Sequence, residues 1–275
     1  MSRIAGGLLG LVLGMPVTWR TDIRVLWLEA YSQDTLMLTS GSAVASGIHT
    51  FQGLRDSARS LGPKRVGVVV ADDEVALLAA SAAAELGIAT VTLIGDGARI
   101  REKAIRLGCD NMISSAEIVE AASTSEAAVV AAELACAGDI NLLLKGHLRT
   151  DELLRAVLDK EAGLRTGRLL SDVMLYEDTL AGYRRLVGVT DGGLNVAPDL
   201  EQKKEIVLNA VDVMHAIGIE CPKMAIMSAT EAVTASLPST VDAQTLTELG
   251  KLGAFGECEV YGPLALDNAL LDSAA

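Results

Sequence analysis

Residues 65–94 read RVGVVVADDEVALLAASAAAELGIATVTLI, and this stretch decides the fold. Its short apolar run Arg65–Val70 is typical of a buried strand. The Ala-rich segment Asp73–Leu86 has the composition of a helix, and Gly87 is the kind of residue that commonly ends one. Thr90–Ile94 is a second apolar run. Strands joined through a helix pair in parallel, so the stretch predicts a β-α-β unit whose sheet is covered by helices.

The same alternation continues along the chain. Elements are predicted as a helix over Ala98–Leu107, a weak strand over Glu117–Glu120, a helix capped by Ser123, Thr124 or Ser125 and ending at Ala137, and a strand over Asn141–Leu144. Later come strands over Asp172–Tyr176, Leu186–Thr190 and Met224–Ser228, and a long helix to Ile217 with Pro198 in its first turn. The predicted class is α/β, with two α/β domains that divide near residue 168.

The first 50 residues differ from the rest. Their charges sum to zero, whereas the remaining chain carries the whole excess of acid. Arg3 followed by the apolar run Ile4–Val17 has the look of a signal peptide, but Pro16 interrupts the run and no cleavage site follows promptly. We therefore predict that residues 1–50 are a poorly ordered N-terminal extension, residues 51–168 a first α/β domain and residues 169–275 a second.

Composition narrows the class of function. The 275 residues are 50% hydrophobic and contain 23 Lys+Arg against 36 Asp+Glu, a net charge of −13, which disfavours a nucleic-acid-binding surface. The four cysteines are far apart with no C-x-x-C pair, so neither a zinc ribbon nor a disulfide scaffold is expected. The three histidines form no metal-binding motif. The sequence predicts a cytoplasmic protein that binds no membrane, nucleic acid, metal or cofactor.

A basic segment follows the fourth predicted strand. It begins Leu144-Lys145-Gly146-His147-Leu148-Arg149-Thr150, where Gly146 permits close backbone approach and Thr150 can cap the next helix. Between Lys145 and Arg168 there are six bases and four acids. A local excess of positive charge in an acidic chain indicates a phosphate-bearing ligand. A solvated helix face with ion pairs such as Arg155 with Asp159 explains the same residues equally well.

Two further segments lie where strands end. In Asp191-Gly192-Gly193-Leu194-Asn195, the acid could act as or orient a base, and the amide could donate to an oxyanion. In Gly262-Pro263-Leu264-Ala265-Leu266-Asp267, Gly-Pro is expected to break the chain after a short strand. Ordinary turns use the same residue types, with Asp267 as a helix cap, so composition alone favours turns at both places.

Taken together, these segments resemble the phosphate acetyl/butyryltransferase family, and the butyryl branch most closely. The resemblance covers about 225 residues and runs through the following motifs in order: Thr50-Phe51-Gln52-Gly53-Leu54, Leu144-Lys145-Gly146 with Thr150, Gly163–Ser171, Thr190-Asp191 with Asn195 and Pro198, Lys204–Val211, and Gly262–Ala269. It implies exchange of a short acyl group between coenzyme A and inorganic phosphate. It also implies two α/β domains around a cleft, similar to the isocitrate/isopropylmalate dehydrogenase architecture, and a homodimer.

The resemblance also assigns roles to residues. Arg155 is the best candidate for the family's anion-binding arginine, with Lys145 and Arg149 as further candidates. Asp191 and Asn195 are the predicted catalytic residues. The remaining predicted substrate-binding residues are Gly146, Thr150, Arg165, Ser171, Gly262 and Asp267.

Two departures from the family pattern bear on activity. Ser171-Asp172-Val173 stands where the family usually has Ser-His-Val. The sequence given also stops before the family segment that carries the catalytic serine and returns to the first domain, so we expect this chain alone to be weakly active or inactive. The alternative is a non-catalytic fragment that binds coenzyme A or dimerises. An oxidoreductase would need a metal-carboxylate cluster and a nicotinamide site, for which the sequence shows no motif.

Overall fold

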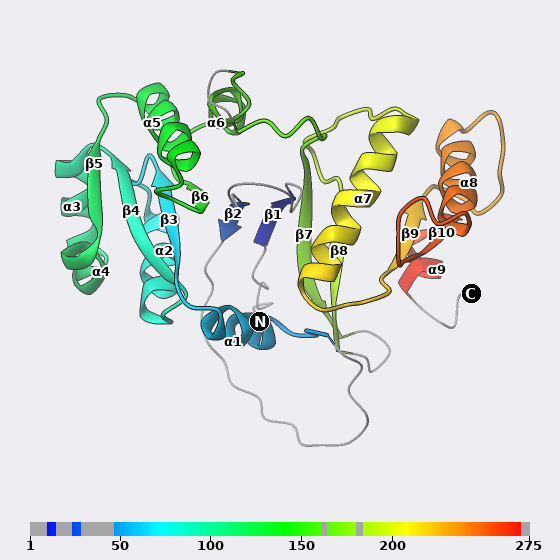
Figure 1. Cartoon of the computed structure of the whole chain (residues 1–275), viewed down its shortest axis with the longest axis horizontal. Helices are drawn as coiled ribbons and strands as arrows, with labels where there is room; N and C mark the ends of the chain where they lie inside the picture. The colour runs from blue at the N-terminus through cyan, green and yellow to red at the C-terminus, as the bar shows by residue number, and fades with distance from the viewer. Residues whose placement is uncertain (1–9, 15–23, 29–46, 161–163, 180–183, 271–275) are drawn as a thin grey trace, which may run out of the picture. The chain divides into compact units, whose positions relative to one another are not determined.

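The computed structural model describes residues 10–14, 24–28, 47–160, 164–179 and 184–270. Its contacts divide the chain into two compact units (Figure 1). Unit 1 is built mainly from Gln52–Arg168, and unit 2 mainly from Leu169–Val173 and the chain from Glu177 onward. The division falls close to residue 168, while the three domain ranges given by the sequence, with their N-terminal extension, stay predictions.

Unit 1 contains a sheet with the strand order β5-β4-β3-β6-β2-β1. Its strands are β1 (Gly10–Gly14), β2 (Arg24–Leu28), β3 (Lys64–Val69), β4 (Ala89–Gly95), β5 (Glu117–Glu120) and β6 (Leu142–Lys145). Every neighbouring pair from β5 to β2 is parallel, and β1 pairs antiparallel with β2. The predicted β-α-β order is therefore confirmed over this part of the chain.

Helices connect the parallel strands of unit 1. They are α1 (Phe51–Ser60), α2 (Glu74–Glu85), α3 (Gly97–Arg106), α4 (Asp110–Ser115), α5 (Thr124–Ala137) and α6 (Thr150–Val157). Asp73, Asp96 and Ser123 each cap a helix by accepting from the backbone N–H three residues on, and Gly138 ends α5 in the left-handed conformation. Of the three predicted caps for α5, Ser123 fills the position.

Small side chains let the helices lie close to the sheet. The buried residues of α5 are all alanine, namely Ala127, Ala128, Ala131, Ala132 and Ala135. The sheet contributes branched residues such as Val68 and Leu93, both fully buried. Burial of this apolar area is the main favourable term for unit 1.

The end of β3 differs from the prediction. The predicted strand ran to Val70, but β3 ends at Val69 and Val70 has φ = 56°. A β-branched residue in the left-handed region is strained, so packing around it must enforce the turn. The backbone N–H of Gly146 donates to the carbonyl oxygen of Val69 (2.8 Å), and that of His147 to the carbonyl of Val70 (3.2 Å). These bonds tie the ends of β3 and β6 together.

Unit 2 combines two pairs of strands with three helices. Its elements are β7 (Ser171–Asp178), β8 (Arg185–Val189), α7 (Leu200–Ala216), β9 (Lys223–Met227), α8 (Pro238–Lys251), β10 (Glu259–Leu264) and α9 (Leu266–Leu270). β7 neighbours β8, and β9 pairs in parallel with β10. A core of Val207, Val211, Leu246, Phe255 and Val260 joins α7, α8 and β10.

Two sequence predictions for unit 2 were wrong in detail. Pro198 does not lie in the first turn of α7, because Asp199 caps the helix and forms a reciprocal capping box with Gln202. Gly262-Pro263 does not break the chain either, since β10 continues through it to Leu264. There the register with β9 shifts between Tyr261 and Leu264, so an irregularity in the strand accommodates the proline.

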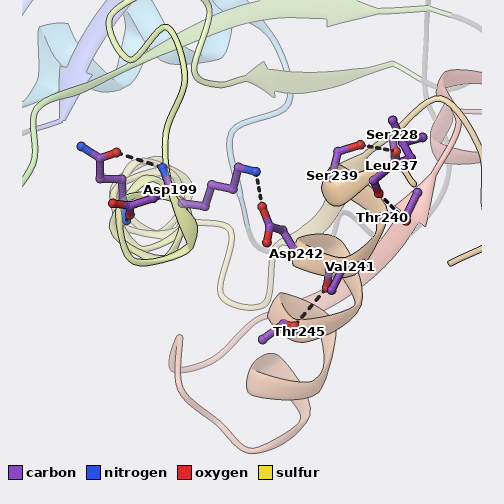
Figure 2. A network of polar contacts seen from close by, with 10 residues as sticks. Asp199, Ser228, Leu237, Ser239, Thr240, Val241, Asp242 and Thr245 are labelled. Carbon is purple, nitrogen blue, oxygen red and sulfur yellow. Dashed lines mark hydrogen bonds and ion pairs between the residues drawn. The ribbon is translucent and has the colours of Figure 1, made fainter. Parts of the chain in front are cut away.

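Polar contacts fix α8 within unit 2 (Figure 2). The Lys203 ammonium of α7 donates to the Asp242 carboxylate of α8 over 2.5 Å. The hydroxyls of Ser228, just after β9, and Ser239, in the first turn of α8, lie 2.8 Å apart. These contacts join α8 to both α7 and the carboxyl end of β9.

Over the described residues, no helix is both long and apolar enough to cross a bilayer.

The contact between Gly146 and Val70 predicts the effect of a methyl group. In Gly146→Ala, the added Cβ would lie 2.1 Å from the Val70 carbonyl oxygen, so the ends of β3 and β6 must separate. We expect a loss of about 1–3 kcal/mol in the free energy of unfolding, measured by urea denaturation. Gly193→Ala is the control because nothing lies within 4 Å of its Cβ position. Equal stability of both variants would contradict this account.

Candidate anion-binding site

Unit 1 contains a cavity of about 570 Å³ at the carboxyl ends of its parallel strands. Its lining residues are Asp73, Val75, Ala76, Thr124, Lys145, Gly146, His147, Leu148, Arg149 and Glu152. Open parallel sheets bind ligands at this edge. The volume is in the range of pockets that hold small molecules.

Three helices begin at this cavity. Asp73, Val75 and Ala76 come from the start of α2, Thr124 is the first residue of α5, and Arg149 precedes the first residue of α6. The N-terminus of a helix carries a partial positive charge and N–H groups that point outward. Asp73 and Ser123 already cap α2 and α5 with their side chains, so α6 is the one of these three helices whose start has no side-chain cap. The lysine and arginine side chains add positive charge to the cavity.

The beginning of α6 lacks the side-chain cap that the sequence predicted. Thr150 is the first helical residue, and Arg149 occupies the cap position with an extended backbone (φ −72°, ψ 143°) and no capping hydrogen bond from its side chain. The prediction of Thr150 as the cap was therefore wrong by one residue. Arginine has no acceptor for the first N–H groups of the helix, so an anionic ligand can take that role.

Lys145 is the last residue of β6, and its half-buried side chain lines the cavity. Its ammonium donates to the carbonyl oxygen of Leu148 over 2.8 Å. Burial lowers the pKa of Lys145, and the nearby Asp73 carboxylate partly opposes that shift. Desolvation thus makes the charge of Lys145 costly in this cavity. A bound anion would restore favourable electrostatics.

Two carboxylates share the cavity with these cations. Asp73 accepts from the Ala76 N–H (2.9 Å), and its other oxygen lies 3.9 Å from Nδ1 of the exposed His147. Glu152 of α6 accepts from the Thr124 hydroxyl of α5 over 2.6 Å. The Glu152–Thr124 bond ties the beginnings of two helices together. The two carboxylates balance the formal charges of Lys145 and Arg149.

The predicted substrate-binding residues of this segment separate into two groups. Lys145, Gly146 and Arg149 line the cavity, whereas Thr150, Arg155 and Arg165 are not among its lining residues. The Arg155 guanidinium is mostly exposed and lies 3.5 Å from Asp151, which also binds Arg149 over 2.9 Å. The hydrogen bond from Arg149 lowers the pKa of Asp151. The anion-binding role of Arg155 stays a prediction.

The sequence reasoning missed the polar cavity residues Asp73, Thr124 and Glu152. Asp73 and Thr124 were assigned only to a helix or its start, and Glu152 was given no role. Their position in the sequence could have identified two of them. Asp73 and Thr124 follow predicted strands of a parallel sheet, so they belong to the same edge of the sheet as Lys145.

The predicted catalytic residues lie in unit 2, in the turn between β8 and α7. One oxygen of Asp191 accepts from the N–H groups of Gly193 (2.8 Å) and Leu194 (2.7 Å), and the other from the Asn195 amide (2.6 Å). Burial alone would raise the pKa of Asp191, but these donors together lower it. The amide of Asn195 also donates to the carbonyl oxygen of Leu170 (3.0 Å). The structure thus brings Asp191 and Asn195 into contact.

Asp172 of β7 lies behind this turn with 6% of its surface exposed. Its carboxylate accepts from the Gly192 N–H, and its carbonyl oxygen from the Thr190 hydroxyl. Burial raises the pKa of Asp172; the Gly192 bond opposes the rise and the neighbouring Asp191 adds to it. The two carboxylates consequently have pKa values shifted in opposite directions.

The other predicted substrate-binding residues of unit 2 have structural contacts. Ser171 is fully buried and accepts from the Asn209 amide of α7 over 2.8 Å. Gly262 lies within β10, where its carbonyl oxygen accepts from the Thr247 hydroxyl (3.0 Å). Asp267 lies in the first turn of α9. Across the described parts of both units, no group of three or more His, Cys, Asp or Glu side chains is placed to hold a metal ion.

An α/β chain with a cavity at the carboxyl edge of its parallel strands has the general geometry of proteins that bind small ligands. The particular family follows from comparison with known proteins. The profile described as phosphate acetyl/butaryl transferase matches residues 113–275. The chain belongs to this family, as the resemblance in sequence predicted.

Individual relatives agree with this membership. The chain is 40% identical to the phosphate butyryltransferase of Clostridium acetobutylicum over 228 residues, which is 83% of this chain and 74% of the relative. It is 39% identical to the phosphate acetyltransferase of Rhizobium meliloti, over 80% of this chain and 68% of that protein. A family of named transferases establishes the enzyme class of this chain as transferase.

Solved structures confirm the fold class. A branched-chain phosphotransacylase from Enterococcus faecalis V583 superposes with a TM-score of 0.63 at 25% identity, covering 77% of this chain and 72% of that structure. The EutD phosphotransacetylase of Staphylococcus aureus has a TM-score of 0.60, with coverage of 81% and 76%, and shares the fold at 16% identity.

The opposite pKa shifts of Asp172 and Asp191 predict opposite effects of pH on two variants. A carboxyl whose folded pKa is raised loses stability as the pH rises above its unfolded pKa. Asp172→Asn should therefore gain free energy of unfolding over the parent chain between about pH 4 and about pH 7. Its amide oxygen can still accept from Gly192.

Asp191→Asn is the matched comparison. A carboxyl whose folded pKa is lowered stabilises the fold above its unfolded pKa, and this contribution is lost as the pH falls through the folded pKa. This variant should be less stable than the parent at neutral pH, by a difference that shrinks on acidification. Urea unfolding across the pH series measures both. The same pH trend in the two variants would refute the assignment.

Proposed function

We propose that this chain is a phosphate acyltransferase that exchanges a short acyl group between coenzyme A and inorganic phosphate. In the forward direction an acyl-coenzyme A and phosphate give an acyl phosphate and free coenzyme A. The observation that carries the proposal is the cavity of unit 1, with Lys145, Arg149 and the starts of three helices around it. The names of the relatives supply the acyl chemistry.

The proposed reaction requires a cavity that binds anions. A phosphate dianion must approach the carbonyl carbon of a thioester, so cations and N–H donors have to hold it in position and offset its repulsion from the phosphates of coenzyme A. Lys145 and Arg149 supply the cations. An oxygen of phosphate adds to the carbonyl, and the carbon–sulfur bond breaks to release the thiolate. No covalent intermediate with the enzyme is needed.

Asp191 and Asn195 are the proposed catalytic residues of unit 2. The lowered pKa of Asp191 keeps its carboxylate ionised at neutral pH, which suits a role as acceptor or orienting group rather than as proton donor. Its carboxylate fixes the amide of Asn195, whose N–H groups are the donors available in this turn. Gly262, Asp267 and Ser171 are proposed to contribute to substrate binding through the backbone around them.

The remaining properties follow from family resemblance and composition. We propose a cytoplasmic homodimer that needs no cofactor, with the coenzyme A thioester as substrate. The scattered cysteines and the absence of a metal-binding motif in the sequence support this proposal.

Phosphate-dependent release of thiol from butyryl-coenzyme A tests the function. Lys145→Met removes one charge-assisted contact to phosphate, so we expect kcat/KM for phosphate to fall about 10- to 100-fold. Lys64→Met is the matched control, because Lys64 is exposed at the opposite end of a neighbouring strand. A blank without phosphate gives the background rate of thiol release.

Three outcomes separate the possibilities. Release that depends on phosphate and on Lys145 supports the proposal. Release that Lys145→Met leaves unchanged would place the phosphate site elsewhere. Calorimetric binding of coenzyme A with no phosphate-dependent release would favour the non-catalytic alternative.

A further inference from the structure

We propose that Lys145 is a site of covalent modification, at which an acyl phosphate transfers its acyl group to the side-chain amine. The inference rests on the proposed function only in that acyl phosphate is the product formed beside this lysine. The modification converts the cation of the anion-binding cavity into a neutral amide. The product of the enzyme would then switch off the site that holds its phosphate substrate.

The position of Lys145 favours this reaction. An acyl phosphate bound through its phosphate group to Arg149 occupies the same cavity of about 570 Å³ that Lys145 lines. Binding therefore holds the reactive carbonyl close to the amine, which raises the rate far above that of a collision in solution. A lysine on the open surface has no such advantage.

Burial of Lys145 also increases the share of its neutral amine, which is the reactive form, relative to an exposed lysine. Its ammonium has a backbone carbonyl, that of Leu148, as an acceptor at 2.8 Å, and burial lowers its pKa.

The reaction balances without an added oxidant or reductant. The ammonium of Lys145 first gives up one proton to solvent. The lone pair of the neutral amine then attacks the carbonyl carbon, and the bond from that carbon to the phosphate oxygen breaks. The remaining proton to be lost from nitrogen leaves with the phosphate as hydrogenphosphate, and an amide remains on the lysine.

Mass spectrometry of the intact, folded chain treated with acetyl phosphate tests the proposal. We expect Lys145 to be acetylated at least about tenfold faster than the exposed Lys64 and Lys251. Excess inorganic phosphate should protect Lys145 alone, because it competes for the cavity. Acetylation of Lys145 no faster than that of the two exposed lysines, or equal protection of all three, would overturn the proposal.

A pair of variants examines the role of the environment. Asp73→Asn keeps a helix cap but removes the carboxylate that raises the pKa of Lys145, so acetylation of Lys145 should become faster. Asp96→Asn alters the equivalent cap of α3 and should leave that rate unchanged. The same acceleration in both variants would contradict a local effect.

The labelling experiment can fail or succeed independently of the test of the proposed function. Acetyl phosphate is supplied directly, so labelling does not require turnover. Selective labelling without thiol release would support the modification while the proposed function fails. Thiol release that depends on Lys145, without selective labelling, would support the function and overturn the modification. Lys145→Arg, which keeps the charge, should show no acetylation at this position.

Discussion

The close approach of two strand ends is the constraint on which the site depends. Gly146 lies against the carbonyl oxygens of Val69 and Val70, and both hydrogen bonds at this point are backbone to backbone. A side chain at position 146 would separate the ends of β3 and β6. Because the ends meet, Lys145 and the residue that caps α2 reach a common cavity. The strained backbone of Val70 is the energetic cost of that arrangement.

Electrostatics in the two units follow different patterns. In unit 1, cations and helix starts face a cavity in which burial lowers the pKa of a lysine. In unit 2, two acids lie together, and hydrogen bonds decide which of them ionises readily. Asp191 has three short donors, whereas Asp172 is buried with fewer of them. Both patterns are set by backbone N–H groups as much as by charged side chains.

The sequence predicted β3 to β6 and the helices α2, α3 and α5 well because local signals agreed there, but it did not predict β1, β2, α1 or α4. Apolar runs marked the strands, and Ser123 was among the predicted caps of α5. It predicted β10 less well, because Gly262-Pro263 normally ends a strand and only the pairing with β9 shows otherwise. The turn of Val70 was also missed, since no local rule favours valine in a left-handed conformation.

The candidate site could be predicted only in part for a similar reason. Lys145, Gly146 and Arg149 are adjacent in sequence and follow a recognisable strand, so their grouping was accessible. Asp73 and Thr124 come from separate segments, and their place at the cavity depends on the order of strands in the sheet. The acid Asp172 drew notice only as a departure from a family pattern, and its contact with the 190–195 turn required three-dimensional information.

The two carboxylates beside the cavity bear on how long an anion stays there. Asp73 accepts a hydrogen bond from a backbone N–H, and Glu152 accepts one from a threonine hydroxyl. These bonds hold both carboxylates in place beside the cavity. They weaken the attraction that Lys145 and Arg149 provide. A reversible exchange needs a moderate affinity for phosphate. A cavity that bound phosphate too tightly would slow the release of the product that carries the phosphate group.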